Sequence, residues 1–232
     1  MMKKSIINSD DAKVLNFREI LMGSIAPGML YRSSHPIKAN KQETAIALMA
    51  NNAKIAAVIN LHNTNSEVYA QAPFAPWYNF LLERNRIIAL GMDFSITSES
   101  FKRKLKKGLQ FIINTEGPWL IHCYGGVDRT GFVSIVLESF MGAALDDVIN
   151  DYLQSFNSMF ESSIHETHKA DSLSAIRIIS VMSDSIAVND QNLQYISENY
   201  VQKTIGLSSE EAELLKRKLA GEQYYRKPIG AS

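Results

Sequence analysis

The sequence has little of several features that define whole classes of proteins. It contains a single cysteine, so an internal disulfide is excluded. Basic and acidic residues both number 24, so no overall positive charge attracts the chain to nucleic acid or to an anionic membrane. No uncharged stretch is long enough to span a membrane, and the apolar run near the N-terminus is too short for a secretory signal. These absences predict a cytoplasmic protein without nucleic-acid or integral membrane partners.

The order of apolar and helical patterns predicts an α/β fold. Strands are expected at 29–33, 54–61, 86–90 and 118–122, and the second contains a near-continuous apolar run typical of a strand covered on both faces. Helices are expected at 98–115 and 129–141. Asn40 with Glu43 has the form of a capping box for a further helix between the first two strands. Alternating strands and helices predict a mostly parallel sheet flanked by helices, with ligands bound beyond the carboxyl ends of the strands.

Beyond residue 144 the pattern is wholly helical. Helices are expected at 144–155, 170–185 and 190–203, and Ser208 with Glu211 marks the capping box of a last one. Without a Pro/Gly/Ser-rich linker, the chain is expected to comprise an N-terminal segment 1–15, a core 16–160, and a helical extension 161–232 that packs on the core.

The single cysteine lies where the strand 118–122 turns into the helix 129–141. Two adjacent glycines, Gly125 and Gly126, follow Cys123 and can take the conformations that turn successive backbone N–H groups toward one point. Such N–H groups at a helix N-terminus bind anions, and phosphate fits best. We therefore expect phosphate to be bound by the six residues that follow Cys123, which are Tyr124, Gly125, Gly126, Val127, Asp128 and Arg129.

Each neighbour of Cys123 has a chemical task in that setting. A helix N-terminus beside cationic groups favours the thiolate, which is the nucleophilic form of cysteine. Arg129 can hold two phosphoryl oxygens with its planar guanidinium, which lysine cannot do. Thr130 can turn its hydroxyl toward the Cys123 sulfur, and His122 can orient the loop through its ring N–H. The alternative interpretation is a buried cysteine that serves only as a small apolar residue.

The pattern His-Cys-x5-Arg-Thr-Gly at 122–131 resembles the catalytic loop of cysteine-dependent protein tyrosine and dual-specificity phosphatases. A narrower resemblance, over about 16–156, is to the bacterial tyrosine phosphatase family, whose loop reads approximately His-Cys-x-x-Gly-Lys-Asp-Arg-Thr-Gly. The segments 16–20, 28–34 and 151–155 support it. The resemblance implies a tyrosine-phosphatase-like fold and a metal-independent phosphomonoester hydrolase, without cofactor, that forms a cysteinyl-phosphate.

The chain departs from that family at two places. Val127 replaces the usual lysine, and the segment 58–62 has asparagine and histidine where an aspartate and an arginine are more common. A phosphorylated protein is therefore the expected substrate, with inositol phosphates or phosphoinositides as the rival class. Cationic loop positions would favour that rival, and 124–127 are uncharged.

Two aspartates compete for the role of general acid, which protonates the leaving oxygen and is worth about 10²- to 10⁴-fold in rate. Asp93 follows the strand 86–90, thirty residues before Cys123, as in the mobile acid loop of dual-specificity phosphatases. Asp128 lies inside the phosphate loop, as in some phosphoinositide phosphatases. We favour Asp93 and interpret Asp128 as an acceptor that orders the loop.

Other classes of protein remain as alternatives. A phosphate-binding pseudophosphatase would capture phosphoproteins without turnover, although the chain keeps nucleophile, arginine and candidate acid. Arsenate reductases and low-molecular-weight phosphatases carry the loop near the N-terminus, and the reductases need further cysteines. His165 and His168 are one residue short of the spacing of a zinc motif, so no metal is assigned. The aromatic-rich segment 63–85 is either a substrate-recognition wall or a packed connection.

Overall fold

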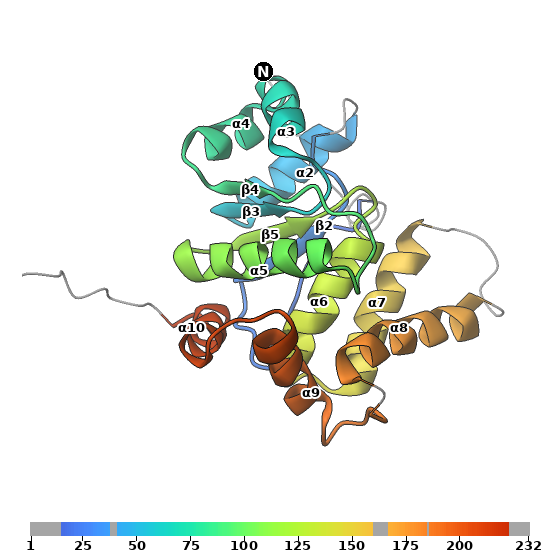
Figure 1. Cartoon of the computed structure of the whole chain (residues 1–232). Helices are drawn as coiled ribbons and strands as arrows, with labels where there is room; N and C mark the ends of the chain where they lie inside the picture. The colour runs from blue at the N-terminus through green and yellow to red at the C-terminus, as the bar shows by residue number, and fades with distance from the viewer. Residues whose placement is uncertain (1–14, 38–40, 160–166, 185, 223–232) are drawn as a thin grey trace, which may run out of the picture.

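The fold is built on one central sheet. The computed structural model describes residues 15–37, 41–159, 167–184 and 186–222. Within them five strands pair in the order β1-β2-β5-β3-β4 (Figure 1). Their bounds are Arg18–Glu19 for β1, Leu30–Ser33 for β2, Ala57–Asn60 for β3, Ile87–Ala89 for β4 and Trp119–His122 for β5. The short edge strand β1 is antiparallel to β2 and the other pairs are parallel, so the predicted mostly parallel α/β sheet is confirmed.

Both faces of the sheet are covered, which explains the apolar run Trp119-Leu120-Ile121 in its central strand β5. In β5, Trp119 and Ile121 point into one core and Leu120 points into the other, as the two-residue repeat of a strand requires. Helices α2 (Lys41–Asn52), α3 (Asn65–Gln71) and α4 (Pro76–Glu83) cover one face, and α5 (Glu99–Asn114) and α6 (Asp128–Phe140) cover the other (Figure 1). The capping box expected at Asn40 lies outside the described residues.

The aromatic-rich segment 63–85 folds into α3, the short 3-10 helix η1 (Ala72–Phe74) and α4. Tyr78 is fully buried, whereas Phe74 and Phe80 are exposed. The segment is therefore a packed connection through Tyr78 and presents other aromatic side chains at the surface. The sequence pattern did not indicate these helices because each is short, at most eight residues.

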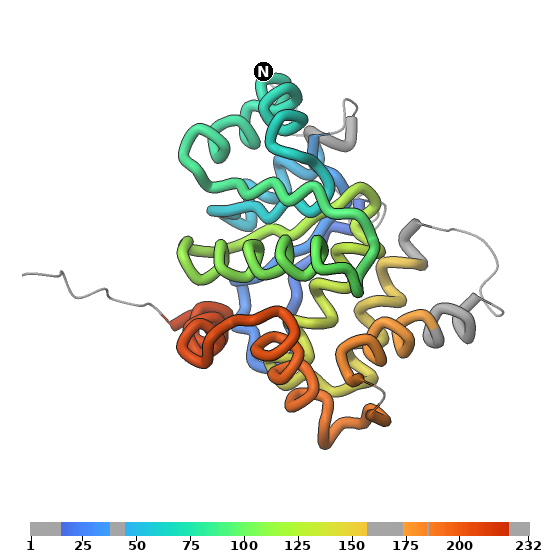
Figure 2. The backbone as a smooth tube through the Cα atoms, viewed as in Figure 1, coloured from blue at the N-terminus to red at the C-terminus, as the bar shows by residue number. Residues whose placement is uncertain are grey.

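The C-terminal helices pack on the rest of the fold. They are α7 (Leu145–Met159), α8 (Thr167–Ser183), α9 (Leu193–Asn199), the π-helix η2 (Tyr200–Thr204) and α10 (Ser209–Leu219). Helix α9 contacts α6, and α10 contacts α5 (Figure 2). The capping box of Ser208 and Glu211 is confirmed. One buried apolar cluster extends from Ile20 to Leu219, and the division of the chain at residue 160 stays a prediction.

Helix α5 has a regular apolar stripe, as its spacing predicts. Phe101, Leu105, Leu109 and Ile112 are all buried on one side of this helix. None of the helices in the described parts of the chain is long and apolar enough to cross a membrane.

The carboxyl ends of the parallel strands meet at one edge of the sheet. Ser33 at the end of β2 is paired with His122 at the end of β5, and Asn60 at the end of β3 is paired with both His122 and Ala89 of β4. The loops that follow these strands therefore start side by side. They contain the residues that the sequence singles out.

Candidate active site

Cys123 follows β5 directly and lies at the base of the loop 123–127. Its side chain is 2% exposed. The backbone N–H of Gly126 donates to its Sγ at 3.3 Å. Gly126 has a φ of +75°, and a Cβ atom there would lie 2.5 Å from the carbonyl oxygen of Ser33. Only glycine fits this position, because it tolerates both the close approach and the left-handed backbone.

The other loop positions differ in exposure. Tyr124 is about half exposed, and its carbonyl accepts a hydrogen bond from the His35 N–H at 3.1 Å. Val127 is buried and precedes the first residue of α6. The loop therefore ends at a helix N-terminus, as predicted. Thr130 is also buried, and its hydroxyl has no hydrogen-bond partner among the described residues. Its support of the sulfur stays a prediction.

Arg129 connects the phosphate loop with two neighbouring loops. Its Nη1 donates to the carbonyl oxygen of Met92 at 2.8 Å and lies 3.0 Å from Nδ1 of His62. Arg129 is half-buried at the first turn of α6. The guanidinium is thus fixed by the loops that follow β3 and β4, beside the His62 ring, which contacts Tyr124 of the loop 123–127.

The loop after β3 is shaped by Asn60. The Oδ1 atom of this residue accepts hydrogen bonds from the backbone N–H groups of His62 and Asn63, each at 2.9 Å. The turn places the His62 ring against the ring of Tyr124, with centroids 5.3 Å apart. His62, which the sequence interpretation noted only as a departure from the family pattern, therefore lines the site beside Arg129.

His122 is held in a buried chain of hydrogen bonds. Asn60 Nδ2 donates to the Tyr78 hydroxyl at 3.0 Å, and that hydroxyl lies 3.1 Å from Nε2 of His122. Nδ1 of His122 lies 3.3 Å from the Cys123 carbonyl oxygen. Burial, and next the neighbouring His35, lower the pKa of His122 well below its usual value, so the ring is neutral at pH 7. A neutral ring with its proton on Nδ1 satisfies both contacts and donates to the Cys123 carbonyl. That His122 orients the loop stays a prediction.

Asp93 lies in the loop that follows β4, at the same edge of the sheet. It is exposed, and its carboxylate accepts a hydrogen bond from the Ser95 N–H at 3.1 Å. The preceding residue is fixed, because the Met92 N–H donates to the Leu61 carbonyl at 2.8 Å and the Met92 carbonyl accepts from Arg129. Asp93 is thus attached to a backbone that contacts Arg129.

Asp128 is the first residue of α6 and is exposed. No hydrogen bond to its carboxylate occurs among the described residues, so the structure gives no support to the interpretation of Asp128 as the acceptor that orders the loop. The described contacts that hold the loop are made to its backbone carbonyls, among them those of Tyr124 and Gly126. Asn16 Nδ2 and Arg32 Nη2 both donate to the Gly126 carbonyl, each at 2.9 Å.

Several residues around the site were not predicted as site residues. They contact the loop 123–127 or a residue that contacts it, and they are Asn16, Arg32, His35, His62, Tyr78 and Asp151. One signal was present in the sequence: Arg32 lies in a strand that is otherwise buried, and a buried arginine needs a partner. Its partner, Asp151, is 119 positions away, and spacing alone cannot connect the two.

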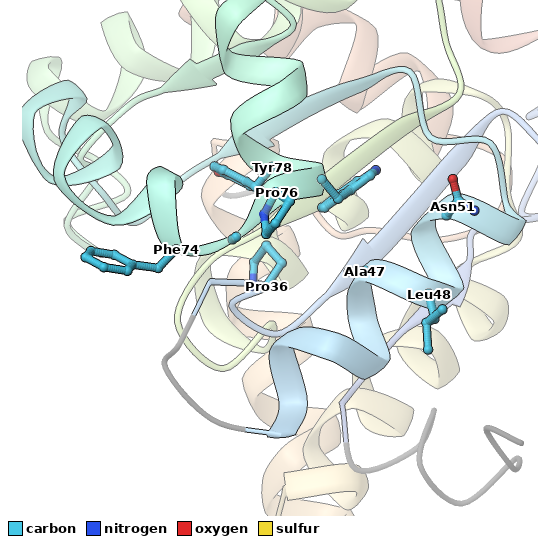
Figure 3. A pocket seen from close by; sticks show the side chains of 9 residues that line it. Pro36, Ala47, Leu48, Asn51, Phe74, Pro76 and Tyr78 are labelled. Atoms are coloured by element: carbon cyan, nitrogen blue, oxygen red, sulfur yellow. The ribbon is translucent and has the colours of Figure 1, made fainter. Parts of the chain in front are cut away.

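An apolar cavity of about 360 Å³ lies between α2 and the segment η1–α4 (Figure 3). Its wall consists of Pro36, Ala47, Leu48, Asn51, Phe74, Ala75, Pro76, Trp77 and Tyr78. None of these residues belongs to the loop 123–127. Tyr78 connects the cavity with the site, because its hydroxyl contacts His122.

The described residues contain no group of three histidine, cysteine or carboxylate side chains that could hold a metal ion. The side chains of His165 and His168 lie outside the described part of the chain.

A strand, a turn with a buried cysteine and a helix that begins one residue before Arg129 form the arrangement of a cysteine-dependent phosphatase. Comparison with known protein families identifies the family within this class. The tyrosine phosphatase family matches residues 12–221, so the chain belongs to this family, and the resemblance found in the catalytic loop is confirmed.

Two similar solved structures are catalytic cores of Siw14. One is the core catalytic domain of the PP-IP phosphatase SIW14 from S. cerevisiae in complex with citrate, at 18% identity and a TM-score of 0.42, over 72% of this chain and 91% of that one. The other, a Siw14 catalytic core, has 16% identity and a TM-score of 0.40, over 81% of this chain and 96% of that one. Comparison with curated proteins finds no match.

Proposed function

We propose that this protein hydrolyses phosphomonoesters through a cysteinyl-phosphate and acts on phosphotyrosine, alone or with other phosphorylated residues, in cytoplasmic proteins. The observation that carries the proposal is the contact of the Gly126 N–H with the Cys123 sulfur at 3.3 Å. A backbone donor aimed at sulfur at the start of a helix favours the thiolate. The same loop geometry presents N–H groups to the oxygens of a bound phosphate.

The reaction has two steps. The Cys123 thiolate attacks phosphorus, so an S–P bond forms while the P–O bond to the leaving group breaks, and Asp93 gives its proton to the leaving oxygen. In the second step Asp93 takes a proton from water, the water oxygen bonds to phosphorus, and the thiolate leaves. Arg129 and the loop N–H groups hold the three equatorial oxygens throughout.

The residues at the rim of the site, Tyr124 and His62, favour a substrate with an aromatic ring. Positions 124–127 carry no charge, and the exposed ring of Tyr124 stands edge-on to His62 beside Arg129. A phenyl phosphate can bury its ring against such a surface. An inositol polyphosphate would need several further cations, and the loop supplies only Arg129.

A comparison of substrates tests this proposal. We expect kcat/KM for a phosphotyrosine peptide to exceed that for an inositol polyphosphate by at least about tenfold, which corresponds to about 1.4 kcal/mol in the transition state. Tyr124→Lys adds a cation at the rim and should shift the preference toward the inositol polyphosphate, while Tyr124→Phe should leave it unchanged. A wild-type preference for the inositol compound would assign the rival substrate class. No turnover on any phosphomonoester would indicate a pseudophosphatase.

The choice between Asp93 and Asp128 predicts a dependence on the leaving group. Asp93→Ala should lower kcat/KM by about 10²-fold for an alkyl phosphate and much less for an aryl phosphate whose leaving group is a weak base. The matched variant Asp128→Ala should lower both rates equally and only slightly. Turnover of both variants across phosphates of graded leaving-group pKa checks this. If only Asp128→Ala shows the dependence, Asp128 is the acid.

A further inference from the structure

Gly126 contributes to the site through both of its peptide groups. Its N–H donates to the Cys123 sulfur, and its carbonyl accepts from Asn16 and Arg32. Glycine populates positive and negative φ about equally, so its own conformational preference does not keep the N–H on the sulfur. The conformation must be fixed from outside, and the two donors to the carbonyl are placed to do so.

Both donors are held by one carboxylate on α7. The Asp151 carboxylate forms an ion pair with the Arg32 guanidinium and accepts from Arg18 Nε at 2.8 Å. Arg18 in turn donates to the side-chain oxygen of Asn16. Asp151 therefore reaches the Gly126 carbonyl by two routes, one through Arg32 and one through Arg18 and Asn16. Arg32 is fully buried and Asp151 is 4% exposed, so water does not compete with the bond between these two side chains.

The charges of this cluster are consistent with that role. Burial raises the pKa of Asp151, but the guanidiniums of Arg32 and Arg18 outweigh it and bring the pKa to about 2. Burial lowers the pKa of Arg18 to about 10, so it stays a cation at neutral pH. Burial, and next Asp151, raise the pKa of the fully buried Glu138 well above its usual value. With Glu138 neutral, the cluster carries two positive charges and one negative charge behind the loop.

We propose that Asp151 is a positioning residue for the nucleophile. Through Arg32 and through Arg18 with Asn16, it holds the Gly126 peptide so that its N–H stabilises the Cys123 thiolate. This inference rests on the proposed role of Cys123 as nucleophile. It adds Asp151, 28 positions further along the chain, as a residue that acts on Cys123 through other residues.

Alkylation of Cys123 tests the proposal directly. Because the chain has one cysteine, the rate of its reaction with iodoacetamide, measured against pH, reports this thiolate alone. We expect Asp151→Asn to move the midpoint of the profile upward by about one pH unit, so that alkylation below the midpoint is about tenfold slower. Asn16→Gly should move it in the same direction by a smaller amount. Glycine accepts the positive φ of 52° at position 16.

The direction of the shift separates positioning from simple charge. Asp151→Asn removes a negative charge, and through charge alone it would favour the thiolate and lower the midpoint. Arg129, His35 and His62 interact electrostatically with His122, the residue before Cys123, and neither substitution changes these four side chains. Asn16→Gly changes no charge, so it isolates the contact with Gly126 and remains the deciding variant if Asp151→Asn does not fold.

The control is Asp190→Asn. Asp190 accepts from the Leu145 N–H at the start of the same helix α7 and does not contact Gly126. This variant should alkylate like the wild type. An unchanged or lowered midpoint in Asn16→Gly, or a lowered one in Asp151→Asn, would overturn the proposal. Alkylation needs no turnover, so an enzyme that lacks phosphatase activity contradicts the proposed function without changing this result.

Discussion

Serine in place of Cys123 should lower kcat on an aryl phosphate by roughly 10⁴-fold or more. A serine hydroxyl is not ionised at neutral pH, and no described base within the loop is placed to take its proton, so the attacking group is lost. Steady-state turnover of an aryl phosphate, with a free phosphate assay, measures the change.

Phosphate binding provides the control for this variant. The Gly126 carbonyl, Arg32 and Arg129 are unaltered by the substitution, so calorimetric titration with a phosphotyrosine peptide should still show binding. Binding without turnover would locate the defect in the chemical step. Wild-type turnover by Cys123→Ser would remove Cys123 from the mechanism.

Lysine in place of Arg129 should lower kcat/KM by about 10²- to 10³-fold even though the positive charge is kept. The planar guanidinium can bind two equatorial oxygens while its Nη1 stays on the Met92 carbonyl, and an ammonium group cannot do both. The loss should appear in kcat as well as in KM, because the charge on these oxygens must be supported in the transition state.

Arg103→Lys is a matched control for that substitution, since Arg103 is exposed on α5, away from the loop 123–127. It should leave both kinetic constants unchanged. If Arg129→Lys also leaves them unchanged, Arg129 holds the loops together without binding the phosphate.

Much of this fold could be predicted from the sequence, because the patterns that indicate each element lie within short, continuous segments. The apolar run Trp119-Leu120-Ile121 is typical of a strand that is covered on both faces. The helix expected from residue 129 begins within one residue of the start of α6. The candidate site could be predicted equally well, because Cys123, the two glycines and Arg129 lie within seven consecutive residues.

The side chains that hold the loop 123–127 in place could not be predicted in the same way, because they lie far apart in the sequence. Arg32 on β2 and Asp151 on α7 come together only in the folded chain, and neither residue type signals the other. The short helices α3 and α4 were missed for a different reason. Their stability comes from the burial of Val68, Tyr78 and Leu81 rather than from a long periodic pattern.

The covalent intermediate is the most direct measurement of the proposed chemistry. An aryl phosphate with a weakly basic leaving group should phosphorylate the Asp93→Ala variant readily, because that step needs little acid, while hydrolysis lacks its base. Rapid acid quench and mass spectrometry of the peptides should then find one phosphoryl group on Cys123. A phosphoryl group on any other residue would contradict the mechanism.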